Sequence, residues 1–140
     1  MKHPFSLASR HSPDLARVLA YWKSLLRGSA EIPFWDDARL SDLPDLADRL
    51  FLIDVFRKPE RFRFGVVGER VGGKDLSGLF LDDVDLPPPH AFLRGQCSVT
   101  VECSKPTFYR REGAGGYERL VLPMWGEGHV SMLLGAVDVE

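Results

Sequence analysis

A glycine-rich stretch carries a pattern that could bind a nucleotide. Residues 68–75, GERVGGKD, follow the apolar run RFRFGVV and come within one residue of the phosphate-binding loop G-x-x-x-x-G-K-[ST]. In such a loop the backbone N–H groups and the lysine hold phosphates, and the final hydroxyl binds Mg²⁺. Lys74 is in place, but Asp75 replaces the hydroxyl and adds negative charge where a triphosphate would lie.

The surroundings of this stretch favour a turn. Gly78 and the lack of periodicity after Lys74 argue against the helix that has to begin there. The candidate magnesium ligand, Asp54, precedes the stretch instead of following it, and the strands around it have an antiparallel pattern. A nucleotide-binding enzyme is therefore the least favoured alternative. The glycines expected to let the chain turn sharply are Gly65, Gly68, Gly72 and Gly73.

Other reactive residue types do not form a catalytic pattern. Asp36-Asp37 and Asp82-Asp83 are adjacent pairs in loops, typical of turns and caps. Cys97 and Cys103 match no zinc spacing, and along a helix their Cα atoms would be about 9 Å apart, too far for a disulfide. We expect reduced thiols, no metal site and no enzymatic activity.

Composition indicates one ordinary globular domain. The chain has 140 residues, 44% hydrophobic and 27% charged, with a formal net charge of -2, so a nucleic-acid partner is not expected. We expect a flexible leader over residues 1–11 and a single domain over 12–140. Because no secretory or membrane-spanning pattern is present, a cytoplasmic location is expected.

Periodicity predicts the order of the elements. Ser12-Pro13-Asp14 begins an amphipathic helix that ends at Gly28. A short helix over 41–49 precedes a hairpin of strands over 50–56 and 61–68. A helix starting at His90 ends at Lys105-Pro106, and strands follow over 106–112, 117–125 and 129–140. The stripe of the first helix comprises Leu15, Val18, Leu19, Trp22, Leu25 and Leu26.

These elements predict an α+β fold with a mostly antiparallel sheet. Leu120, Leu122 and Met124 share one face of their strand, while Val121 and Trp125 share the other. A strand that is apolar on both faces is covered on both sides. We expect the middle helix on one side, and the first helix or a second copy of the protein on the other. Leu15, Val18, Leu19, Trp22 and Leu26 are the candidates for this helix-packing or dimer contact.

Several segments together resemble a bacterial group of PAS-like domains. They include Tyr21-Trp22, Arg27-Gly28, LFLIDV, RFRFGVVGERV, and Gly73–Gly78 with the sequence GKDLSG. GYERLVLP at 116–123 and MLLGA at 132–136 resemble the last hairpin of the same group. The resemblance covers residues 14–138. It departs from the group between Val71 and Gly72, where a few apolar residues that form a short helix are missing.

The resemblance implies a five-stranded antiparallel sheet in the order 2-1-5-4-3, with helices on one face and the leading helix on the outer face or on a partner. It also implies a ligand, haem or flavin between sheet and helices, or a dimerisation role. Haem or flavin is not expected, because His90 is better read as a surface or cap residue and Cys97 lacks the Asn-Cys-Arg-Phe context.

The pocket candidates come from the predicted strands and the middle helix. Tyr109, Arg111, Tyr117 and Arg119 alternate on adjacent strands, so they can hold an anionic or aromatic ligand. They can also pair across the strands, which we favour. The full candidate set is Phe64, His90, Phe92, Cys97, Tyr109, Arg111, Tyr117 and Arg119.

The expected function is a stand-alone, non-enzymatic sensory domain that forms a homodimer, binds a small molecule and signals through a separate partner protein. The alternative is a dimerisation or scaffolding module without a ligand. The two differ in whether Phe64, Phe92 and Leu93 fill the space between the sheet and the middle segment.

Overall fold

The leading helix begins where its capping residues predict. The computed structural model describes residues 12–139, so the expected leader over 1–11 lies outside the described residues. Helix α1 spans Pro13–Ser24, and the Ser12 hydroxyl accepts a hydrogen bond from the Leu15 amide at 3.2 Å. The helix ends before Gly28, which adopts φ +56° in the following turn, so its predicted end was four residues too late.

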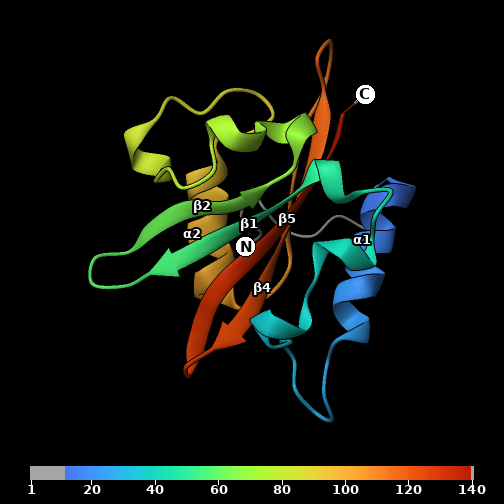
Figure 1. Cartoon of the computed structure of the whole chain (residues 1–140), viewed down its shortest axis with the longest axis vertical. Helices are drawn as coiled ribbons and strands as arrows, with labels where there is room; N and C mark the ends of the chain where they lie inside the picture. The colour runs from blue at the N-terminus through green and yellow to red at the C-terminus, as the bar shows by residue number, and fades with distance from the viewer. Residues whose placement is uncertain (1–11, 140) are drawn as a thin grey trace.

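Five antiparallel strands form one sheet, as the sequence predicted. They are β1 Leu50–Phe56, β2 Arg61–Val67, β3 Thr107–Arg111, β4 Tyr117–Gly126 and β5 His129–Val139. Their order is β2-β1-β5-β4-β3 (Figure 1). The two long strands, β4 and β5, pair over their whole length, and β5 is the central strand of the sheet.

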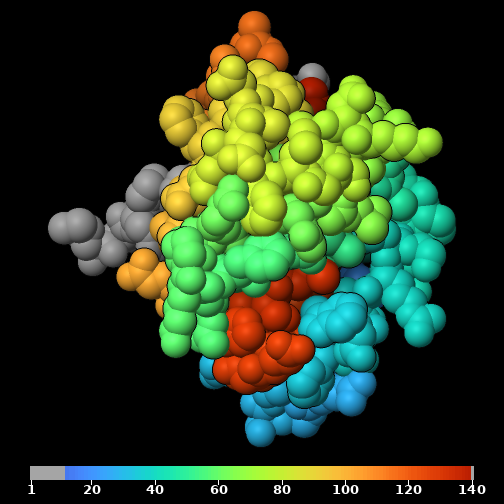
Figure 2. Space-filling model, turned by 60° about the vertical axis from the view of Figure 1, so that its left-hand side comes forward, coloured from blue at the N-terminus to red at the C-terminus, as the bar shows by residue number. Residues whose placement is uncertain are grey.

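The two helices cover opposite faces of this sheet. Helix α2, Leu93–Cys103, packs over the inner face, and α1 packs over the outer face (Figure 1). The loop between β2 and α2, coloured lime to yellow, spreads over the upper part of the molecule in Figure 2. This arrangement confirms the α+β expectation and provides both covers that the two-sided apolar strands require.

Two predicted helices are shorter than expected. The 41–49 segment forms separate 3₁₀ turns, Leu40–Asp42 and Ala47–Arg49, because Pro44 disfavours a helical Leu43, which adopts ψ 64°. Helix α2 starts at Leu93 instead of His90, because Phe92 adopts a left-handed φ of 63°. The loop between β2 and α2 holds single 3₁₀ turns, Glu69–Val71, Gly73–Asp75 and Leu81–Asp83, which agrees with the expectation that no helix begins at Lys74.

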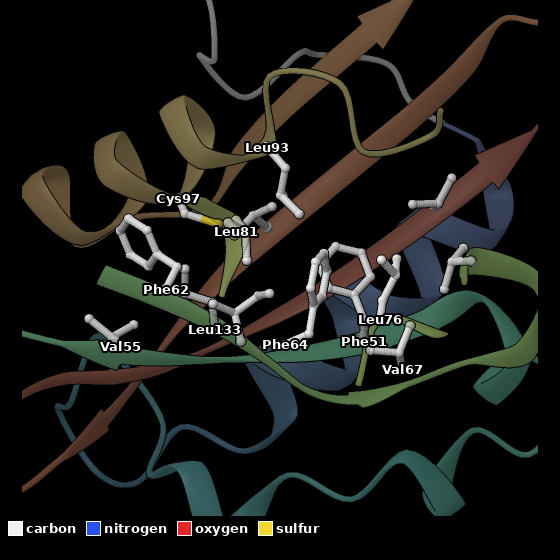
Figure 3. Packing of buried hydrophobic residues seen from close by; sticks show 14 of the residues in the cluster. Phe51, Val55, Phe62, Phe64, Val67, Leu76, Leu81, Leu93, Cys97 and Leu133 are labelled. Carbon is white, nitrogen blue, oxygen red and sulfur yellow. The ribbon is translucent and has the colours of Figure 1, made fainter. Parts of the chain in front are cut away.

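The core has two layers that share the sheet. In the inner layer, Leu93 and Cys97 point from α2 toward Phe62, Phe64 and other sheet side chains (Figure 3). In the outer layer, the α1 stripe packs on Leu120, Leu122, Met124, Leu134 and Ala136. Trp22 also donates from its indole N–H to the Pro123 carbonyl of β4 at 2.8 Å, which fixes α1 to the centre of the sheet.

Gly68 shows what the glycine-rich stretch does in the fold. A Cβ at this position would lie 2.3 Å from the Asp48 carbonyl oxygen and 2.7 Å from that of Ala47. Its φ of -63° is ordinary, so the glycine is needed for this close approach and not for its conformational freedom. Within the described residues, no helix is long and apolar enough to cross a membrane.

Candidate functional site

The inner layer contains a buried arginine. On β4, Tyr117, Arg119 and Val121 alternate toward α2, and Arg119 is 0% exposed. A fully buried arginine is rare in proteins unless it is paired. Its contacts therefore decide what this part of the molecule does.

Neutral acceptors surround the Arg119 guanidinium. Nε donates to Gln96 Oε1 at 2.6 Å, and Nη1 donates to the Pro89 and Ala91 carbonyl oxygens, both at 2.9 Å. Its Cζ lies 4.9 Å from the ring centroid of Tyr109, the residue directly opposite on β3. The guanidinium thus joins the sheet to α2 and to the segment that leads into it.

Arg119 makes no ion pair with a carboxylate among residues 12–139. Burial lowers the pKa of Arg119 below its usual value, because the charged form loses water. An arginine nevertheless keeps its proton in a protein. A positive charge therefore lies between the sheet and α2 with only dipoles to balance it.

His90 is buried beside this arginine, between the two residues whose carbonyls bind Nη1. It is 0% exposed, and its ring makes edge contacts with Phe51 and Phe64 at centroid distances of 5.2 and 5.3 Å. Its Nε2 lies 2.6 Å from the Val71 carbonyl oxygen, so Nε2 carries the proton and donates. Burial lowers the pKa of His90 to about 4, so the ring is neutral at pH 7 and Nδ1 is an acceptor. The expectation of a surface or cap histidine was wrong, because the His90 side chain is buried against Phe51 and Phe64 and α2 begins only at Leu93.

Three buried polar atoms of this region make no hydrogen bond of normal geometry with the described residues, although the Tyr117 hydroxyl lies close enough to Arg119 to raise the pKa of its guanidinium. They are Arg119 Nη2, the Tyr117 hydroxyl oxygen and His90 Nδ1, all buried. Arg49 Nε and Ser131 Oγ are also unpartnered, but belong to other parts of the chain. Buried polar atoms are normally satisfied, so a group of three in neighbouring residues indicates a missing partner.

A fully bonded network lies on the other side of the guanidinium. Gln96 Nε2 donates to Thr107 Oγ1 at 3.1 Å, and the Thr107 and Thr100 hydroxyls lie 2.6 Å apart. These three side chains are 0% exposed and hold Gln96 in position to accept from Arg119. Sequence reasoning missed them, although Gln96 and Thr100 are spaced i, i+4 and so share one helix face. We call Arg119, His90, Tyr117, Gln96, Thr100 and Thr107 the Arg119 cluster.

The structure separates the eight predicted pocket residues. Phe64, His90, Cys97, Tyr117 and Arg119 are buried in the inner layer, and Tyr109 is half-buried beside them. Phe92 is 69% exposed, so its place in the pocket was wrong; its left-handed conformation turns it outward against Tyr109, with 6.1 Å between ring centroids. Arg111 ends β3 opposite Tyr117 and is exposed, so it lies apart from the buried candidates. Burial raises the pKa of the Cys97 thiol to about 12, so it is not a nucleophile at pH 7.

The α1 stripe packs on the protein's own sheet. Leu15, Val18, Leu19 and Trp22 are buried there, so these side chains are not free to contact a second copy. Leu26 lies beyond the end of the helix and is only half-buried. Of the two roles considered for this stripe, the structure places it in helix packing.

The glycine-rich stretch lacks the geometry of a phosphate-binding loop. Gly73–Asp75 forms a single 3₁₀ turn with Lys74 exposed, while Val71 and Leu76 anchor the stretch in the inner layer. No helix therefore directs a row of N–H groups at an anion here. Across residues 12–139, no three His, Cys, Asp or Glu side chains come together to hold a metal ion.

Two surface hollows are lined by residues outside the Arg119 cluster, although the second includes Val71, whose carbonyl accepts from His90. One of about 340 Å³ is lined by Ala30, Glu31, Ile32, Phe34 and Trp125, and one of about 210 Å³ by Arg49, Arg70, Val71 and Val139. Phe64 and Leu93, both 0% exposed, fill the inner layer between sheet and α2. Comparisons with protein-family models, curated proteins and solved structures found no match. The Arg119 cluster is the candidate site on which a function can be argued.

Proposed function

We propose that the chain is a PAS-like, non-enzymatic sensory domain that binds a small molecule at the Arg119 cluster. The observation that carries this proposal is the buried Arg119 charge, which has no carboxylate partner among the described residues and lies beside two further unpartnered polar atoms. A buried charge costs several kcal/mol unless it is paired. A bound molecule that supplies the missing partner would offset this cost.

The position of the cluster agrees with this role. The resemblance to PAS-like domains implies a ligand between the sheet and the helices, and Arg119 lies between β4 and α2. The groups around it suit binding better than catalysis. His90 has its proton engaged by Val71, and the Cys97 thiol stays protonated at pH 7.

The contacts of Arg119 could transmit ligand binding to the start of α2 and to the surface beside it. Its Nη1 holds the carbonyls of Pro89 and Ala91, which lead directly into α2. A ligand that changes these contacts would move the start of α2 and the surface beside it. We propose that a separate partner protein reads this movement, and that the domain is a homodimer formed by a surface other than the α1 stripe.

A second candidate is an interaction module that binds no small molecule. The filled inner layer favours it, since Phe64 and Leu93 occupy the space that a large ligand would need. In that case the unpartnered atoms of the Arg119 cluster would be satisfied by buried water alone.

Native mass spectrometry of freshly purified protein separates the two candidates. We expect a dimer that carries a small molecule, and we expect Arg119→Gln to lose that molecule. Arg111→Gln is the matched control, because Arg111 lies on the same sheet face but is exposed. If the protein carries nothing, and no fraction of a cell metabolite extract raises its unfolding temperature, the sensory proposal fails and the interaction module stands.

A further inference from the structure

The unpartnered atoms of the Arg119 cluster specify the chemical class of the ligand. We propose that it is a small carboxylate, preferably with a hydroxyl group next to the acid. We further propose that it binds by taking the guanidinium of Arg119 from the Pro89 and Ala91 carbonyls. This inference rests on the proposed function, because it names the ligand and the response of that same site.

The buried charge of Arg119 favours an anionic ligand. Arg119 is bonded to one amide oxygen and two backbone carbonyl oxygens, all neutral. Hydrogen bonds from arginine to a carboxylate are about twice as strong as those between neutral groups, and the two planar forks match each other. The carboxylate would also balance a cation that burial disfavours. An anion is therefore the ligand that gains most from this position.

The donor or acceptor character of the three unpartnered atoms indicates which kind of carboxylate would fit. Arg119 Nη2 can only donate, and the Tyr117 hydroxyl can donate as well, so one carboxylate oxygen can accept from both of them. The other carboxylate oxygen then accepts from Nη1 in place of the Pro89 and Ala91 carbonyls. His90 Nδ1 can only accept, because the proton of the neutral ring is on Nε2. A hydroxyl group adjacent to the acid supplies that donor. A simple acid satisfies two of the three atoms, and a hydroxy acid satisfies all three.

In this proposal the segment Pro87–Phe92 controls the access of a ligand to Arg119. Arg119 lines neither of the hollows described above, and the carbonyls of Pro89 and Ala91 accept hydrogen bonds from its Nη1. The segment is not part of a helix or strand, and its last residue, Phe92, is 69% exposed against Tyr109. When a carboxylate takes over the guanidinium, the two carbonyls lose their donor. The segment can then swing outward and make room for the ligand.

Calorimetry and thermal unfolding with matched probes test the ligand class. The probes are sodium acetate, sodium L-lactate and sodium succinate, each compared with its uncharged amide at constant ionic strength. We expect the acids to bind and to raise the unfolding temperature, L-lactate to bind more tightly than acetate, and the amides to have no effect. Tyr117→Phe removes one donor and should weaken L-lactate binding about tenfold. Arg119→Gln should abolish the binding, and Arg111→Gln should leave it unchanged.

Hydrogen exchange tests the displacement. The His90 amide donates to the Pro87 carbonyl and the Leu93 amide to that of His90, so both report on the segment. We expect L-lactate to speed exchange of these amides while it slows exchange in the strands. Binding that leaves their exchange unchanged would overturn the displacement. Should Arg119→Gln fail to fold, Tyr117→Phe still decides, because it deletes only an unpartnered oxygen.

The failure of this inference can be told from the failure of the proposed function. Mass spectrometry of the small molecule released on denaturation identifies its class. A neutral or cationic ligand, with equal responses to acids and amides, overturns the carboxylate inference and leaves the sensory role intact. If no molecule is released and the protein responds to no probe or extract, both the carboxylate inference and the sensory proposal fail.

Discussion

His90 and Arg119 are polar residues in an apolar layer, and the surroundings of each determine its chemistry. Phe51, Phe64 and the Val71 carbonyl keep His90 neutral, while neutral acceptors hold a charged Arg119. Both arginines were predicted as pocket candidates from the sequence, because they alternate with Tyr109 and Tyr117 on adjacent strands. This alternation could not show which one is buried, because that depends on where β3 ends and where α2 crosses it.

The pH dependence of stability should report the burial of His90. The pKa is about 4 in the folded chain against 6.5 for a free histidine, so between these values the unfolded chain binds a proton that the folded one does not. Stability should therefore fall as the pH drops from about 6.5 to about 4, by about 3 kcal/mol for this group. Urea unfolding at several pH values measures the loss, and the His129→Gln variant should show the same loss. An NMR titration in which the His90 ring protonates near pH 6.5 would contradict this.

The Tyr117 hydroxyl should contribute nothing to folding in the absence of ligand. Because its oxygen is buried without a partner, Tyr117→Phe should leave stability within about 0.5 kcal/mol of wild type or raise it by about 1 kcal/mol. Thr107→Val is the contrast, since it removes a hydroxyl bonded to both Gln96 and Thr100 and should cost about 1–3 kcal/mol. Denaturant unfolding of the two variants at pH 7 compares them. A clear loss in Tyr117→Phe would mean that the hydroxyl has a partner in solution.

At the scale of elements, periodicity and turn residues predicted most of what forms. Strands β1, β2, β4 and β5 and helix α1 have clear apolar patterns with capping or turn residues at their ends. The misplaced boundaries depend on single backbone angles, such as the left-handed Phe92 before α2. Such an angle is set by tertiary contacts, here the inward course of His90, and no local pattern encodes it.

Replacing Gly68 tests the structural role of the glycine-rich stretch. Gly68→Ala should destabilise the protein by about 1–3 kcal/mol, because the added Cβ meets the rigid backbone of Ala47 and Asp48. Gly65→Ala is the matched control, because Gly65 lies three residues earlier, in β2. Its Cβ would have its nearest contact at 3.4 Å, so stability should change by no more than about 0.5 kcal/mol. Thermal unfolding compares the two, and equal effects would show that Gly68 tolerates a side chain.

At the scale of the whole molecule, both layers depend on one sheet. The two-sided apolar pattern of β4 and β5 predicted covers on both faces. The strand order 2-1-5-4-3 could not be predicted in the same way. Periodicity indicates which strands have two buried faces but not which neighbours they pair with, so this order came from the resemblance to PAS-like domains. Arg119, Tyr117 and His90 were among the predicted pocket residues, but Gln96, Thr100 and Thr107 were not, since the cluster assembles residues from α2, β3, β4 and a loop.

Because both layers of the core pack on the same sheet, we expect them to unfold together. Leu15→Ala in the outer layer and Leu93→Ala in the inner layer should each cost about 2–5 kcal/mol, because both side chains are buried. In either variant, tryptophan fluorescence, to which the outer-layer Trp22 contributes, should change at the same urea concentration as circular dichroism. Separate transitions would show that one layer survives without the other.

We expect Pro123 to limit aggregation of the chain before it has folded. An unfolded molecule exposes Leu120–Trp125, an apolar strand-forming run of the kind that pairs with copies of itself and aggregates. A proline in its middle cannot donate to such a ladder. The folded sheet accommodates it, because β3 begins only at Thr107, opposite Val121, so no β3 residue pairs with Pro123, and Trp22 donates to the Pro123 carbonyl. Pro123→Val should therefore increase light scattering during refolding when compared with wild type at equal concentration, and equal scattering would contradict this protective role.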